Sequence, residues 1–235
     1  MRDLTKFYGL CETSNELNEG LDKGLTNEFI CHFAKIFKTK TMRIWQRMPE
    51  LAKVNDDLSV ELLEKGVKNL RNYLNMLKNA GVERFLLFNW GYLYPNYYKP
   101  IDHMTIPSYI DEPDVYKDFL IITENLYIEI QKEFPEIEYY EISNEPDGPG
   151  GGFFHSNLYN PDDKSTYYSQ DDIVKMALDM NYYASRGIYK INNNYNMGTG
   201  NTMIFSPPAR AWARCCSWRR RCTACTRIYG RTSSG

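Results

Sequence analysis

The chain has 235 residues, a formal net charge of −2 and a hydrophobic content of 43%. This length fits one domain, and a single α/β barrel of about 250 residues is a near match in size. No apolar run approaches the roughly 18 residues that a membrane span requires, so a membrane protein is excluded. The first residues contain no apolar signal segment, which predicts a cytoplasmic protein unless the true N-terminus lies upstream.

The charge is divided unevenly along the chain. Residues 1–208 contain all 30 acidic residues and carry a net charge of −9, whereas residues 209–235 contain seven Arg, no Lys and no acid. Four of the six cysteines also lie in this short tail. We interpret 1–208 as the evolved domain. The tail 209–235 is then the product of a shifted reading frame and is expected to be disordered.

The tail also permits a second interpretation. Cys215, Cys216, Cys222 and Cys225 are potential zinc ligands, and three consecutive arginines beside them could contact phosphates. Only Cys222 and Cys225 have the spacing of a zinc knuckle, however, so the sequence predicts neither a metal nor a nucleic-acid partner.

Short β-rich segments alternate with longer amphipathic segments through the first 208 residues. In chain order the expected strands are 6–10, 41–45, 84–89, 138–143 and 202–206. The expected helices are 27–37, a long helix opened by Ser59 and stopped by Gly81, 114–133, and 171–192. The second helix has apolar residues at spacings of three and four, which is typical of an amphipathic helix.

This alternation predicts an α/β fold of the (β/α)8 TIM-barrel type with about its first five βα units present. Right-handed crossovers would curl such a series into a segment of a barrel. A doubly wound open sheet is the structural alternative, but no Gly-x-Gly-x-x-Gly follows the first strand. A five-strand segment would also leave an open edge, so self-association through that edge is an expected partner interaction.

The expected fourth strand ends in a candidate catalytic carboxyl group. Glu141, Ser143 and Glu145 alternate along it and share one side, and Pro146 ends strand pairing. The carboxyl ends of barrel strands form the active site, where glycoside hydrolysis uses one carboxyl group as acid and a second as nucleophile or base. The alternative is that Glu145 is a turn residue or an acid at a helix N-terminus.

The segment YEISNEPD, Tyr140 to Asp147, resembles the motif of the clan of retaining barrel glycosidases whose fourth strand ends in Asn-Glu-Pro. It is most similar to the form found in the family of β-xylosidases and α-L-iduronidases, although Ser143 replaces a Trp of that form. The resemblance implies that Glu145 is the general acid/base and that Asn144 contacts the sugar 2-hydroxyl. It implies an oligosaccharide or polysaccharide substrate and no cofactor.

Further substrate-contacting residues follow less directly from the resemblance. Arg43 falls where several clan members have an arginine that supports the nucleophile, and Asn89 and Trp90 fall where the clan places sugar-binding residues. Tyr92 and His155 lie in the loops after the third and fourth strands. The alternatives are a barrel-interior salt bridge for Arg43, packing under a loop for Trp90 and Tyr92, and simple solvation for His155.

The clan's nucleophile, a Glu at the end of the seventh strand, has no counterpart in this sequence. Asp179 is the last acidic residue of the chain. We therefore expect a glycoside hydrolase of the retaining type that is inactive as this fragment. A noncatalytic carbohydrate-binding protein with an aromatic site is the alternative function.

Overall fold

The computed structural model describes residues 9–18, 24–100, 105–143, 168–192 and 196–198. Five parallel strands form one sheet in the order β1-β2-β5-β6-β7, and β3 and β4 form a separate antiparallel pair. The five are β1 (Gly9–Glu12), β2 (Thr41–Arg47), β5 (Arg84–Trp90), β6 (Tyr139–Glu141) and β7 (Asn196–Gly198).

Every strand of this sheet lies beside the parallel strand that precedes it in the sequence. A doubly wound sheet reverses its strand order at a switch point, whereas a barrel adds each new strand to the same edge. The described strands contain no such reversal. The fold is therefore a partial TIM barrel, as the sequence predicts.

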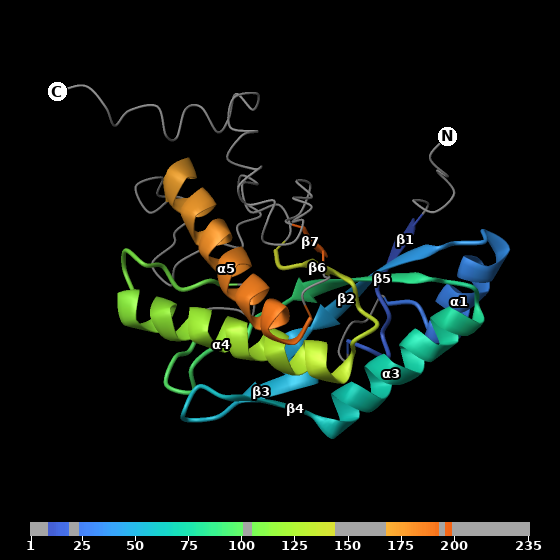
Figure 1. Cartoon of the computed structure of the whole chain (residues 1–235), viewed down its shortest axis with the longest axis horizontal. Helices are drawn as coiled ribbons and strands as arrows, with labels where there is room; N and C mark the ends of the chain where they lie inside the picture. The colour runs from blue at the N-terminus through green and yellow to red at the C-terminus, as the bar shows by residue number, and fades with distance from the viewer. Residues whose placement is uncertain (1–8, 19–23, 101–104, 144–167, 193–195, 199–235) are drawn as a thin grey trace.

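Helices connect the parallel strands and cover one face of the sheet. Figure 1 shows α1, α3 and α4 along the same side of the sheet, with α5 crossing α4. Their bounds are α1 (Asn27–Ile36), α3 (Glu64–Asn79), α4 (Pro113–Glu133) and α5 (Gln170–Ile191), and a short α2 (Met48–Leu51) follows β2 directly. The expected helices 27–37, 114–133 and 171–192 agree with α1, α4 and α5 to within a residue at each end.

The prediction that a helix begins at Ser59 is wrong. Val60–Leu62 forms β4, which pairs antiparallel with β3 (Ala52–Val54), and α3 begins only at Glu64. The Ser59 hydroxyl is used in the hairpin turn, where it donates to Asp57 at 2.6 Å and accepts from Asn55 at 3.0 Å. Pairing with a distant segment thus overrides the helical spacing of the apolar residues. Gly81 ends the helix as expected, with a φ of +95°.

The first and fifth strands of the sheet lie at other residues than the sequence predicts. The first strand occupies Gly9–Glu12 rather than 6–10, of which only residues 9 and 10 are described. The fifth strand of the sheet is Asn196–Gly198, and the expected strand 202–206 lies outside the described residues.

Alternation along the strands gives the sheet two different faces. On β2, Met42, Ile44 and Gln46 are buried on the helix side, where the core of the domain lies. The ring of Tyr140 on β6 contacts that of Tyr127 on α4, and its hydroxyl donates to Gln131 at 2.7 Å. The opposite face, which would be the interior of a closed barrel, carries the intervening residues of each strand.

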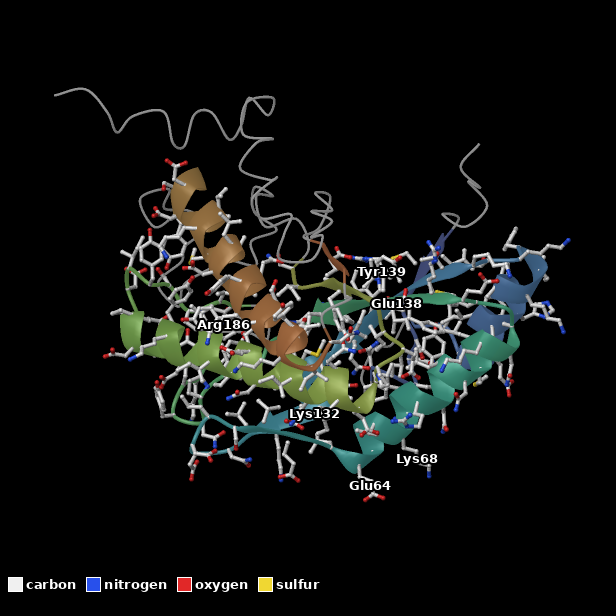
Figure 2. The ribbon with its side chains drawn as sticks, in the orientation of Figure 1. Glu64, Lys68, Lys132, Glu138, Tyr139 and Arg186 are labelled. Atoms are coloured by element: carbon white, nitrogen blue, oxygen red, sulfur yellow. The ribbon has the colours of Figure 1, made fainter. Side chains whose placement is uncertain are left out.

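The packing of α5 on α4 brings the two backbones into close approach. A Cβ added to Gly187 would lie 2.3 Å from the backbone oxygen of Glu124. Arg186 and Lys190 of α5 make ion pairs with the buried Glu124 carboxylate at 2.8 and 2.7 Å, and Arg186 is seen reaching toward α4 in Figure 2.

Replacement of Gly187 by Ala should therefore destabilise the protein. Alanine is favoured over glycine in a helix by about 1 kcal/mol, but the clash with the Glu124 carbonyl forces the helices apart at a typical cost of about 1–3 kcal/mol. Urea unfolding followed by circular dichroism should show a lower midpoint for Gly187→Ala. The exposed control Tyr189→Ala should stay within about 0.5 kcal/mol of the parent. A parent-like or raised midpoint for Gly187→Ala would contradict this packing.

Candidate active site

Arg43 and Glu141 form an ion pair on the face of the sheet opposite the helices. The Arg43 Nε donates to one Glu141 oxygen at 2.6 Å and Nη2 to the other at 2.8 Å, across the intervening strand β5. Only 8% of the Glu141 side chain is exposed. Burial lowers the pKa of Arg43, but the hydrogen bonds to Glu141 and Cys11 outweigh that effect and the pKa is raised. Both oxygens of Glu141 are therefore occupied by a permanent cation.

Aromatic rings surround this pair. The Arg43 guanidinium lies 4.1 Å from the ring centroid of Phe88 and 4.9 Å from that of Trp45. Trp45 in turn meets Phe88 and Trp90 edge to face, with centroid separations of 4.7 and 5.5 Å. Trp45 and Trp90 are half-buried, which leaves ring surface accessible on this face. Such rings offer a stacking surface for the C–H faces of a sugar.

Cys11 on the edge strand β1 completes the cluster. Its sulfur accepts from Arg43 Nη1 and from the indole N–H of Trp45, each at 3.1 Å. These contacts tie β1 to β2 on the barrel-interior face. Sequence analysis does not single out Cys11 or Trp45 as site residues. The alternation of Arg43, Trp45 and Arg47 with buried neighbours on β2 is the signal that identifies this face.

The carboxyl end of β2 is held by a loop residue. The Asn18 amide donates to the Trp45 carbonyl at 2.9 Å and its oxygen accepts from the Arg47 backbone N–H at 2.8 Å. Arg47 also pairs with Glu50 at 3.1 Å and lies 6.0 Å from the Trp90 ring centroid. This end of the strand is thus fixed in position beside the two tryptophans.

Asn89 and Tyr92 lie on the helix side rather than beside the ion pair. Asn89 pairs in register with Gln46 and only 2% of it is exposed. Tyr92 is equally buried, its ring 5.8 Å from that of Phe119 on α4, and burial raises the pKa of its hydroxyl. The geometry matches the alternative of packing for Tyr92. Contact of either residue with a sugar stays a prediction.

Glu145, Asn144 and His155 lie outside the described residues. The described part of β6 and its continuation reach Ser143, which follows Glu141 on the same side of the strand and is buried. Tyr139, labelled in Figure 2, begins this strand. The roles of the three undescribed residues stay predictions, and so does the assignment of 209–235, which is undescribed as well.

The loop after β5 is anchored by tyrosine hydroxyls that bond to carboxylates. Tyr98 donates to Glu112 at 3.0 Å, and Tyr109, from the same loop, donates to Asp172 near the start of α5. Tyr116 on α4 donates to Asp179 at 2.9 Å. Tyr98 and Tyr109 thus hold the loop to the starts of α4 and α5, and Tyr116 joins the two helices. Part of the high tyrosine content of the chain is therefore structural.

Within the described segments, no group of three or more His, Cys, Asp or Glu side chains could hold a metal ion. No helix of the described segments is long and apolar enough to cross a membrane.

Comparisons with solved structures show which known proteins share this fold. No protein-family model matches the chain, and no curated protein matches it. Solved structures do. A GH5-4 broad specificity endoglucanase from Clostridium longisporum is 13% identical with a TM-score of 0.55, and the match covers 83% of this chain and 55% of that one.

Two further structures resemble the chain to a similar degree. A GH5 family lichenase from Caldicellulosiruptor sp. F32 has a TM-score of 0.51 at 10% identity, with 83% of this chain and 52% of that one covered. A β-glucosidase from Thermotoga maritima has a TM-score of 0.51 at 11% identity, with 82% and 47% covered. The chain thus spans about half the length of these structures. At such low identity the likeness establishes the fold, a partial TIM barrel of the kind found in glycosidases.

Replacing one partner of the Arg43–Glu141 ion pair should destabilise the protein more than replacing both partners. Arg43→Met leaves the Glu141 carboxylate buried without its cation, which typically costs about 3 kcal/mol or more. The double variant Arg43→Met, Glu141→Leu should recover much of that loss because no charge stays buried. Urea unfolding of the parent, both single variants and the double variant measures the coupling. Strictly additive losses would show that the pair is not coupled in solution.

Proposed function

We propose that this chain is a glycosidase-type barrel segment that binds an oligosaccharide or polysaccharide at the carboxyl ends of β2, β5 and β6. The likeness of the fold to solved glycosidases, each with a TM-score above 0.5, carries the proposal. The half-buried Trp45 and Trp90 support it, since they lie on the barrel-interior face close to the ends of their strands. The particular likeness to β-xylosidases and α-L-iduronidases rests on YEISNEPD alone.

In this proposal Glu145 donates the proton to the leaving glycosidic oxygen, and Asn144 binds the sugar 2-hydroxyl. Glu141 is excluded as the second carboxylate by its contacts, because Arg43 occupies both of its oxygens. With both oxygens engaged and only 8% of its side chain exposed, Glu141 offers little surface to a bound sugar. Its role is to hold β2, β5 and β6 in register beneath the site.

A retaining mechanism needs a nucleophile that attacks the anomeric carbon from the face opposite the leaving group. No carboxylate follows Asp179 in the sequence, and Asp179 itself is bound to Tyr116 and Lys175 on the helix side. A polypeptide of this sequence should therefore bind sugar and supply a proton without completing hydrolysis.

A small external nucleophile should replace the missing carboxylate. Purified protein of this sequence is expected to show no turnover of p-nitrophenyl glycosides in plain buffer. With added azide, a nitrogen of azide forms a bond to the anomeric carbon while the C–O bond breaks, and the aryl oxygen leaves with the proton from Glu145. The expected product is a glycosyl azide of inverted configuration, measured by p-nitrophenol release and by nuclear magnetic resonance.

With the corresponding phenyl glycoside, whose poorer leaving group depends on protonation, Glu145→Gln should reduce azide-dependent release by about 10²-fold or more, since general acid catalysis contributes that much. The matched control is Glu138→Gln, which alters a carboxylate on the same segment. Robust hydrolysis without azide that Glu145→Gln abolishes would contradict the inactive proposal and imply a second carboxylate. Azide-dependent release that is equal in parent and Glu145→Gln would remove Glu145 from the mechanism.

Noncatalytic sugar binding is the second candidate function, favoured by the Trp45–Trp90 pair. Two of the four tryptophans lie in the tail, so the probe is the variant Trp212→Phe, Trp218→Phe, whose fluorescence comes from Trp45 and Trp90 alone. Titration with xylo- and cello-oligosaccharides should shift this emission, and Trp90→Ala should weaken binding by roughly tenfold, because a contact with an aromatic ring is worth about 0.5–1.5 kcal/mol. An emission that no oligosaccharide alters would contradict both candidate functions.

A further inference from the structure

The outer face of α1 carries a row of exposed apolar side chains. Phe29, Phe33 and Ile36 are 47%, 37% and 57% exposed, and Phe37 follows at the end of the helix. The rings form a continuous ridge, with centroids 4.8 Å apart between Phe29 and Phe33 and 5.8 Å apart between Phe33 and Phe37. The spacing of three, four and seven residues places the first three side chains on one seam of the helix. We refer to these four residues as the α1 ridge.

Such a seam is a poor arrangement for a solvent-exposed face. The inner side of α1 is already packed, since Ile30, Cys31 and Ala34 are buried in the core. The ridge is thus a second apolar face on the same helix. Contiguous apolar surface of this kind marks an interaction site.

The charges beside the ridge identify its occupant. Glu28 lies in the first turn of α1 and Lys35 in the last, and a separation of seven residues places both on the same flank. Within the described parts of the chain, neither makes an ion pair. In an antiparallel pair of α1 helices, Glu28 of one copy would lie opposite Lys35 of the other, twice by symmetry. In a parallel two-fold pair this flank would instead face the opposite flank of the second copy, so Glu28 and Lys35 would not meet.

We propose that two copies of this chain associate through the α1 ridge as an antiparallel, two-fold symmetric helix pair. In this pair Phe29 packs near Ile36 of the second copy and Phe33 lies close to the symmetry axis. The antiparallel arrangement also opposes the two helix dipoles favourably. In the sequence α1 follows β1, the edge strand of the described sheet.

The ridge is small for a stable dimer. Half-exposed aromatic side chains contribute roughly 100 Å² each, so the ridge buries about 400 Å² per copy, compared with about 800 Å² for a standard interface. The dimer should therefore be weak and dependent on concentration, with dissociation in the micromolar range or above.

The apolar face of α5 offers a matched control. Leu178, Tyr182 and Tyr189 are also exposed, but the charged side chains beside them are paired within the molecule. Lys175 bonds to Asp179, and Arg186 and Lys190 bond to Glu124. These four charged side chains of α5 are thus already engaged within the molecule.

Sedimentation equilibrium of the full chain over about 5–500 μM measures the association. The parent should show a monomer–dimer equilibrium, and Phe33→Asp should be monomeric throughout. Lys35→Glu should weaken the dimer by roughly tenfold, since it opposes Glu28 with a like charge at two symmetric positions. The exchange Glu28→Lys, Lys35→Glu should restore parental association.

The control Leu178→Asp should leave the dimer unchanged. Circular dichroism of each variant separates loss of the dimer from loss of the fold, and the charge exchange tests the contact without altering the apolar side chains. A parent that stays monomeric at every concentration would overturn the proposal. So would a dimer that is insensitive to Phe33→Asp and Lys35→Glu, or one that is abolished by Leu178→Asp.

Discussion

The register of the parallel sheet depends on an ion pair that crosses three strands. Arg43 on β2 reaches over β5 to Glu141 on β6, and its guanidinium covers the ring of Phe88 between them. A shift of one residue in either strand would turn one charged partner toward the apolar core on the helix side. The pair therefore fixes which side chains of the three strands face the barrel interior, where Arg43, Glu141 and Phe88 lie, and which face the helices.

The ion pair with Arg43 also gives Glu141 a different role from the one expected of Glu145. Glu141 lies within β6 and is occupied by Arg43, so it contributes to architecture. Glu145 follows four positions later in the sequence, beyond the strand, where the resemblance places the acid/base. Alternation puts both on one side of an extended strand, but only a residue at the strand end could face substrate. The charge of the buried Glu141 is neutralised by Arg43.

The sequence predicts the parts of the fold that depend on local periodicity. Apolar spacing, caps and glycine stops predict helices α1, α4 and α5 and strands β2 and β5. The alternation of helices and strands predicts that each new strand is added beside the previous one. The β3–β4 hairpin is missed because Val60 and Leu63 begin a helical spacing of apolar residues, while the pairing of Val60 and Leu62 with Val54 and Ala52 is a contact between separate segments. For the site, alternation along β2 groups Arg43 with Trp45. The bidentate contact with Glu141 requires the register of three strands, which single-sequence patterns do not specify.

The distribution of exposed apolar residues follows from the incomplete arc. In a closed ring each helix has a neighbour on both sides, and among the described helices α3 and α4 satisfy this condition. Neither contributes a large exposed hydrophobic residue, whereas α1 and α5 at the two ends both do. Apolar faces on these two helices indicate that the surfaces are adapted to a protein neighbour rather than to water. On α5 the adjacent charges are neutralised within the molecule. On α1 the charges of the flank are arranged for an antiparallel neighbour, and a second copy of the same helix provides that complement.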